Sequence, residues 1–106
     1  MTKTIQPVLA ELRRALQAFY GPRLANVVLF GSHARGDAAP ESDIDVLVVL
    51  KGPVHPGEEI LRTSGIVADL SWRVNGLISC VFMDETRYRH RNGPLLRNIR
   101  REGVAV

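Results

Sequence analysis

Two carboxylates stand at the head of an apolar run, SDIDVLVVL, at residues 42–50. In a strand, residues two apart face the same way, so Asp43 and Asp45 would direct their carboxylates to one side. At about 5 Å and an effective dielectric constant of about 20, the two charges repel by on the order of 3 kcal/mol. A divalent cation turns this cost into attraction, and an oxygen-only ligand set favours Mg²⁺ or Mn²⁺. Asp43 and Asp45 are therefore the predicted metal ligands.

A small-residue turn, Gly31-Ser32, forms the second half of the predicted site and follows the apolar run 24–30. Glycine lets the backbone approach a ligand closely, and a helix starting after it would direct amide groups at the same cavity. The Ser32 hydroxyl and the Arg35 guanidinium add two groups suited to phosphate. Gly31, Ser32 and Arg35 are accordingly predicted to bind the phosphates of a nucleoside triphosphate, next to the metal held by the two aspartates.

Short elements must position these residues. Apolar periodicity predicts helices over 5–19, 56–74 and 94–101, and strands over 24–30, 44–50, 77–83 and 104–106. The first three strands are expected to be buried. In the second helix the residues expected to share one inward face are Ile60, Val67, Leu70, Ser71 and Val74, and in the third they are Leu95, Leu96 and Ile99. The order of elements indicates an α/β domain of the α+β type, with one small mixed sheet flanked by helices.

Bulk composition narrows the class of protein. The 106 residues are enough for a single domain, 1–106, and 45% of them are hydrophobic while 24% are charged. No apolar run approaches the roughly 20 residues needed to span a bilayer. The first residues, MTKTIQPVLAEL, lack the apolar core of a secretory signal, and a single cysteine, Cys80, forms no internal disulfide. These features predict a cytoplasmic protein without membrane association.

The segment FGSHARGDAAPESDIDVLVVL, residues 30–50, resembles the signature of the minimal nucleotidyltransferases of the DNA polymerase β-like superfamily. That signature is a hydrophobic residue, Gly-Ser, a spacer of about ten residues and Asp-x-Asp between hydrophobics. The resemblance implies transfer of a nucleoside monophosphate, usually AMP from ATP, to a hydroxyl with release of pyrophosphate. A simpler alternative, that Asp43 caps a turn and Asp45 ends a strand, explains each residue but not their joint spacing.

The family also implies a partner. Stand-alone members of this size are often paired with a small helical HEPN protein, and the precedent is an antitoxin that adenylylates its toxin. The expected partners are therefore ATP or another nucleoside triphosphate and a HEPN-type protein. A chain this small could also self-associate into a homo-oligomer through an edge strand.

The third carboxylate of the family has no counterpart here. Aligning LISCVFMDE (77–85) with the strand that carries it places Ser79 where the acid is expected. Asp84 lies five residues further on, which is about 16 Å along a strand, and its side chain would face the opposite side of the sheet. It therefore cannot take the place of the third acid. Two interpretations stay open: an active nucleotidyltransferase with two carboxylates, or a catalytically impaired subunit that binds a nucleotide or a partner.

Positive charge is concentrated near the C-terminus. Residues 85–106 carry six arginines and two glutamates, whereas residues 1–84 have a net charge of −1. A solvated arginine-rich surface is the preferred interpretation, and binding of RNA or DNA is the alternative. The arginines concerned are Arg87, Arg89, Arg91, Arg97, Arg100 and Arg101.

Overall fold

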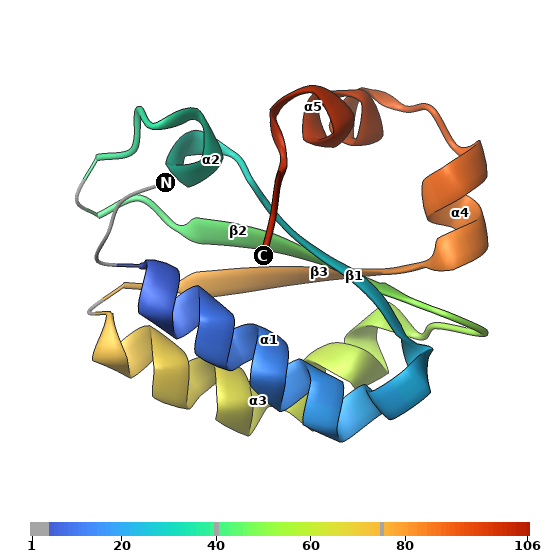
Figure 1. Cartoon of the computed structure of the whole chain (residues 1–106), viewed down its shortest axis with the longest axis horizontal. Helices are drawn as coiled ribbons and strands as arrows, with labels where there is room; N and C mark the ends of the chain where they lie inside the picture. The colour runs from blue at the N-terminus through green and yellow to red at the C-terminus, as the bar shows by residue number, and fades with distance from the viewer. Residues whose placement is uncertain (1–4, 40, 75) are drawn as a thin grey trace.

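A computed structural model describes residues 5–39, 41–74 and 76–106 of the chain (Figure 1). In chain order its elements are α1 (Gln6–Tyr20), the 3₁₀ turn η1 (Gly21–Arg23), β1 (Leu24–Phe30), α2 (Ser32–Arg35), β2 (Ile44–Leu50), α3 (Pro56–Arg73), β3 (Ile78–Asp84), α4 (Glu85–His90), α5 (Pro94–Glu102) and β4 (Val104–Ala105). Every predicted helix and strand is present, and no end moves by more than one residue. The predicted fold class, a small mixed sheet with flanking helices, is confirmed.

The four strands form one sheet in the order β3-β2-β1-β4. β1 pairs antiparallel with β2 and with β4, and β2 pairs parallel with β3. β2 is thus an inner strand, and all its residues from Val46 to Leu50 are buried. In this register Asp45 lies between Phe30 of β1 and Ser79 of β3.

Helices cover both faces of the sheet, with α1 and α3 on one face and α2, α4 and α5 on the other (Figure 1). Because side chains alternate along a strand, Val46 and Val48 join the core under α1 and α3. Leu47 and Val49 of the same strand pack on the other face with Leu96 and Ile99 of α5. Asp45 shares the parity of Leu47 and therefore lies on the face of α2 and α5.

The first helix follows the predicted amphipathic pattern. Its buried side chains, Leu9, Leu12, Leu16 and Tyr20, recur at three- and four-residue steps and lie toward the sheet. Gly21 ends the helix with a positive φ of 58°, and Pro22 follows it. The chain then turns directly into β1, which leads to the predicted site.

The second long helix, α3, buries Leu70 and packs Val67 and Val74 against the core as predicted, but it also buries two polar residues that the sequence pattern did not indicate. Its buried residues are Glu59, Thr63 and Leu70, whereas Ile60 is 51% exposed. The Tyr20 hydroxyl donates to Glu59 Oε1 at 2.8 Å, and the Thr63 hydroxyl donates to the Glu59 carbonyl at 2.8 Å. These partners stabilise the buried carboxylate of Glu59, together with Arg62, whose Nη1 is 3.1 Å from Glu59 Oε1. The apolar pattern of a single helix cannot reveal such polar partners. The expected inward position of Ile60 is therefore wrong.

Three further expectations need correction near the C-terminus. The strand expected over 77–83 is an edge strand, and only Ile78 and Phe82 in it are buried. Leu95, expected to point inward, is 45% exposed. The helix α4 was not predicted: Asp84 caps it by accepting a hydrogen bond from the Arg87 amide at 2.7 Å.

No helix in the described part of the chain is both long enough and apolar enough to cross a membrane.

Candidate active site where β1 and β2 meet

The first contact of the site joins Gly31, just after β1, to Asp45 of β2. Gly31 has a φ of +77°, and a Cβ atom added to it would lie only 2.6 Å from Asp45 Oδ2. Both the backbone conformation and the close approach require glycine at this position. The fold therefore brings the predicted phosphate-binding turn directly against one of the two predicted metal ligands.

After Gly31 the chain makes a single helical turn, α2. The amides of Ala34 and Arg35 both donate to the Gly31 carbonyl at 3.1 Å, and Gly36 ends the turn with a φ of +85°. A helix was expected at this place, but four residues are too few for a substantial macrodipole. Phosphate binding here would depend on local amides and on the Ser32 hydroxyl, which has no hydrogen-bond partner among the described residues.

The two aspartates differ in environment. Asp43 is exposed, whereas Asp45 is half-buried on β2. Burial raises the pKa of Asp45 above the ordinary value, and the negative charge of Asp43 raises it further, while His33 and Arg35 oppose the shift. The predicted electrostatic conflict between the two carboxylates is therefore present in the folded protein.

This donor set fits a divalent cation of the Mg²⁺ type. Such ions take oxygen ligands and keep several waters or phosphate oxygens, so two carboxylates are enough protein ligands. Within residues 5–39, 41–74 and 76–106, no group of three or more His, Cys, Asp or Glu side chains is arranged to hold a metal ion. As predicted metal ligands, Asp43 and Asp45 would have no third protein ligand among the described residues.

Arg35 lies next to the site but is engaged in two ion pairs. Its Nε is 3.2 Å from Asp37 Oδ2, and its Nη1 is 3.2 Å from Glu102 Oε2 at the end of α5. A phosphate contact by Arg35, as the sequence predicts, would require it to exchange at least one of these partners. Glu102 lies 67 positions away in the sequence, so no local signal indicates this ion pair.

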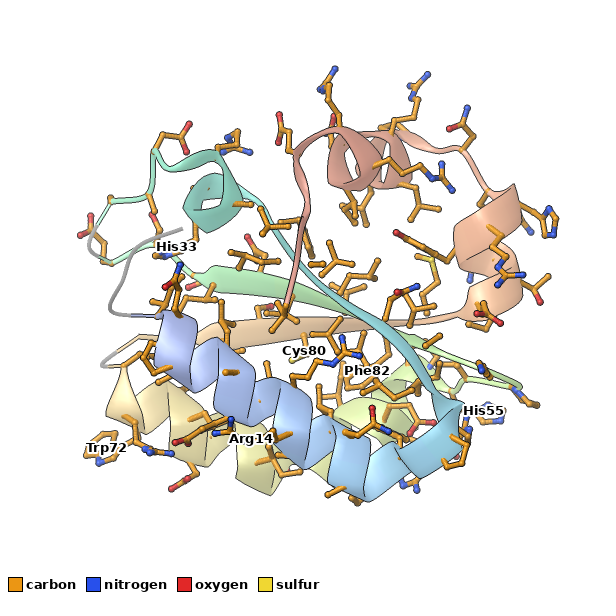
Figure 2. All side chains as sticks on the ribbon, viewed as in Figure 1. Arg14, His33, His55, Trp72, Cys80 and Phe82 are labelled. Atoms are coloured by element: carbon orange, nitrogen blue, oxygen red, sulfur yellow. The ribbon has the colours of Figure 1, made fainter. Side chains whose placement is uncertain are left out.

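His33 is a neighbour of the site that the sequence did not single out. Figure 2 shows His33 at the turn α2. This residue is only 8% exposed, and its Nε2 lies 3.2 Å from the carbonyl of Ser42, the residue before Asp43. A carbonyl accepts hydrogen bonds, so Nε2 carries the proton in this contact. The side chain thus ties the turn α2 to the start of the carboxylate segment.

The strand β3 carries the gap that the sequence indicated. Ser79, which the alignment of the segment 77–85 places at the position of the family's third acid, pairs with Asp45 in the parallel register. Asp84 pairs with Leu50 at the opposite end of the strands and caps α4. No carboxylate therefore lies beside Asp45 on β3.

Two C-terminal arginines have hydrogen-bond partners nearby in the chain. Arg89 pairs with Glu85 at 3.2 Å, and Arg100 donates to Asn92 Oδ1 at 3.2 Å and to the Arg91 carbonyl at 2.8 Å. Such contacts are typical of a solvated surface on which arginine side chains bind neighbouring groups of the same protein. They favour the interpretation of a basic surface over that of a nucleic-acid site.

Comparison with known proteins identifies the family. Residues 9–100 match the nucleotidyltransferase domain family. Two candidate protein adenylyltransferases of the archaeon Methanocaldococcus jannaschii are 46% and 41% identical to the chain over 44 residues. Each alignment covers 42% of this chain and 44% of the relative, so less than half of either relative is matched.

Solved structures confirm the fold. A candidate minimal nucleotidyltransferase superposes with a TM-score of 0.63 at 24% identity, over 100% of this chain and 97% of the other. A toxin–antitoxin complex with AMP-PNP superposes with a TM-score of 0.62 at 19% identity, over 90% of this chain and 69% of the matched chain. These similarities show a shared fold. The family match over residues 9–100 shows that the chain belongs to the nucleotidyltransferase domain family.

Proposed function

We propose that the protein transfers AMP from ATP to a hydroxyl group on a partner protein and releases pyrophosphate. The observation that carries this proposal is the contact between Gly31 and Asp45. It joins a turn suited to phosphate to a carboxylate suited to a cation, which are the two halves of a nucleoside triphosphate site.

Each site residue has a distinct role in this proposal. The backbone at Gly31 and the Ser32 hydroxyl bind the triphosphate, and Asp43 and Asp45 hold Mg²⁺ or Mn²⁺. The bound metal would neutralise the charge of the phosphate oxygens. Arg35 would contact a phosphate after leaving Asp37 or Glu102.

The transfer itself is an in-line displacement. The acceptor oxygen forms a bond to the α-phosphorus while the bond from that phosphorus to the bridging oxygen breaks, and pyrophosphate leaves with the electron pair. The acceptor gives up its hydroxyl proton. Because Ser79 replaces the family's third acid, that proton passes to water instead of a carboxylate of β3.

A protein acceptor is supported by the relatives. The matched archaeal proteins are named as protein adenylyltransferases, and one structural neighbour is a toxin–antitoxin complex with AMP-PNP. We therefore propose a partner protein of the HEPN toxin type, with this chain as the antitoxin.

A second function is favoured by one observation, the serine opposite Asp45. Without a third acid, the protein would bind a nucleotide and a partner but transfer AMP slowly or not at all. Loss of a proton acceptor in the transition state costs on the order of 10²- to 10⁴-fold in rate. Under this alternative the chain is a nucleotide-binding or partner-binding subunit.

The two functions are separated by incubation with ATP labelled at the α-phosphate and Mg²⁺, with lysate of the source organism as acceptor. We expect a labelled protein band that disappears with Asp43→Asn, a loss of about 10³-fold for removal of about 4 kcal/mol of charge stabilisation. Asp84→Asn is the matched control, because it removes a β3 carboxylate distant from the site and keeps a good N-cap for α4. Binding of ATP without any labelled band would support the impaired subunit.

A further inference from the structure

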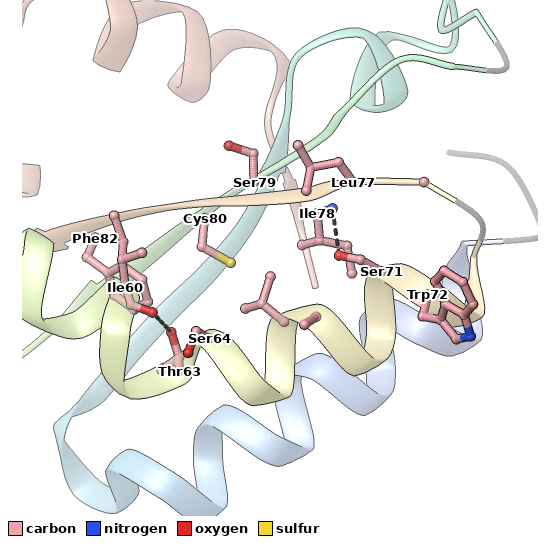
Figure 3. Close-up of a pocket in the computed structure, with 13 residues that line it drawn as sticks. Ile60, Thr63, Ser64, Ser71, Trp72, Leu77, Ile78, Ser79, Cys80 and Phe82 are labelled. Atoms are coloured by element: carbon pink, nitrogen blue, oxygen red, sulfur yellow. Dashed lines mark hydrogen bonds between the residues drawn. The ribbon is translucent and has the colours of Figure 1, made fainter.

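A groove of about 560 Å³ opens between α3 and β3 (Figure 3). None of the side chains that line it carries a formal charge. Three large apolar residues along it are unusually exposed: Trp72 by 86%, Leu77 by 56% and Ile60 by 51%. Such a patch on a small protein is typical of a surface that another chain covers.

One wall of the groove is the outer edge of the sheet. The Leu77 carbonyl accepts from the Ile44 amide of β2 at 2.8 Å, whereas the Ile78 amide points the other way and donates to Ser71 Oγ at 3.0 Å. Because backbone groups alternate along a strand, the amides and carbonyls of Cys80 and Phe82 also point away from β2. No described residue hydrogen-bonds to them. This edge is therefore open to a further extended chain.

A chain added to this edge would contact both faces of the sheet. Every second side chain would enter the groove beside Cys80 and Phe82, which point toward α3 (Figure 3). The intervening side chains would lie on the opposite face next to Ser79, about 5 Å from β3 and about 10 Å from Asp45. Ser79 itself points away from the groove (Figure 3). A tyrosine, serine or threonine there would face the predicted metal site.

We propose that the β3 edge and this groove bind an extended segment of the protein acceptor, apolar on one face and hydroxyl-bearing on the other. This inference rests on the proposed transfer of AMP to a protein and adds how the acceptor is held. The uncharged lining complements apolar side chains, and α4, which follows β3 directly, exposes Arg87 to an acidic residue at that end.

A second copy of this chain is a weaker occupant. The side chains of Ile78 and Phe82 are 2% and 4% exposed because they already pack in the core of their own subunit. A neighbouring β3 that paired with the edge could not release them to fill the groove. The side chains of an extended acceptor segment are not already buried in such a core, so they are free to enter the groove.

The experiment uses Trp72, the single tryptophan of the chain, as a reporter. Peptides about eight residues long, alternating valine with tyrosine, serine or threonine and ending in glutamates, are titrated into the full-length protein without ATP. Burial of Trp72 by a bound peptide is expected to shift its fluorescence emission to shorter wavelength. N-methylation of alternate peptide amides should abolish the shift, because it removes the donors that pair with β3.

Two variants on α3 locate the binding. Ser64→Arg places a charge in the groove and should weaken binding by about tenfold or more. Leu61→Arg, on the same helix outside the groove lining, should leave the half-saturating peptide concentration unchanged.

Three outcomes would overturn the inference. They are no shift with any peptide of the panel, an equal shift with the N-methylated peptides, and a shift that depends on protein concentration without peptide. The last would show that a second copy fills the groove. Since the titration needs neither ATP nor turnover, its result is independent of the test of AMP transfer.

Discussion

The two faces of β3 carry opposite chemistry within one strand. On one face Ser79 lies beside the half-buried Asp45, whose pKa is raised by burial and by a second carboxylate. On the other face Ile78, Cys80 and Phe82 line an uncharged groove under α3. Burial raises the pKa of the Cys80 thiol to about 11, so this cysteine is neutral at physiological pH.

This difference separates two tasks. The groups proposed for the transfer come from a short segment, residues 31–45, which leaves β1 and returns into the antiparallel neighbour β2. The groove comes from residues 60–82, where a helix lies over an edge strand. Substitutions on the first face should change the reaction, and substitutions on the second should change which acceptor is held.

The largest expected effect comes from restoring the missing acid. Ser79→Asp should raise AMP transfer by on the order of 10²- to 10⁴-fold, because a carboxylate beside Asp45 can accept the hydroxyl proton or bind metal. The measurement is the initial rate of label transfer to the acceptor at saturating ATP and Mg²⁺.

Ser79→Asn is the matched control for this substitution, since it has a similar size and no charge. Its rate should stay at the wild-type level. A fall in the rate of the Ser79→Asp variant, with its circular dichroism and melting temperature unchanged, would contradict a catalytic role for this position.

The next largest effect distinguishes close approach from backbone strain. Gly31→Ala should lower the free energy of unfolding by about 3 kcal/mol, since φ is +77° and the new methyl group would meet Asp45 Oδ2. Gly36→Ala has a similar φ of +85° but no atom within 4 Å, so it should cost only about 1 kcal/mol. Denaturant titrations of both variants provide the comparison. Equal losses would show that the contact with Asp45 contributes nothing.

A smaller effect is expected at His33, which joins α2 to the carboxylate segment. His33→Leu should cost about 1 kcal/mol by removing the hydrogen bond to the Ser42 carbonyl, a loss of about 4–8 °C in melting temperature. His33→Gln keeps a donor and should recover part of this loss. If both variants melt alike, the hydrogen bond is not what stabilises this turn.

The smallest effect concerns the pH dependence of stability. Because the pKa of Asp45 is raised in the folded protein, the folded state holds this proton more tightly than the unfolded state. The protonated Asp45 side chain therefore contributes most to the free energy of unfolding at low pH. This contribution is lost as the pH rises through the pKa that Asp45 has in the folded protein. Asp45→Asn should make the protein more stable at pH 7, by less than about 1 kcal/mol because the carboxylate is partly solvated.

Melting temperatures of the wild type and of Asp45→Asn, followed from pH 3 to pH 8, measure this effect as a difference. Other carboxylates, such as Glu11, whose pKa is lowered by its hydrogen bond to Arg73, act in both proteins and cancel. Added Mg²⁺ should raise the melting temperature of the wild type more than that of the variant. A variant less stable at pH 7 would contradict the raised pKa.

Much of the site was predictable because its information is local. The spacing from Gly31 to Asp45 indicated two parts of one site, and the fold brings these two residues together. The alignment of 77–85 placed Ser79 at the position of the family's third acid, and the structure sets this serine beside Asp45. The roles of Gly31, Ser32, Arg35, Asp43 and Asp45 in binding and catalysis stay predictions until transfer is measured.

Other features depend on residues far apart in the chain. Glu59 is buried because the Tyr20 hydroxyl, 39 positions away, reaches it, and Arg35 is ion-paired because α5 brings Glu102 beside α2. Likewise, Ile60 and Trp72 are exposed because β3 ends the sheet and nothing described covers the groove there.

By itself the sequence determined the order of the main helices and strands, the glycine turn, the paired aspartates and the serine in place of an acid. The elements, the turn and the aspartate pair follow from periodicity and spacing within short segments, and the serine in place of an acid follows from the resemblance to the nucleotidyltransferases. Only the tertiary structure decided that the polar residues Glu59 and Thr63 are buried, which strand lies at the edge, and where an apolar groove opens. Those features depend on packing between segments far apart in the chain, because the position of one segment decides which side chains of another are covered and which stay exposed.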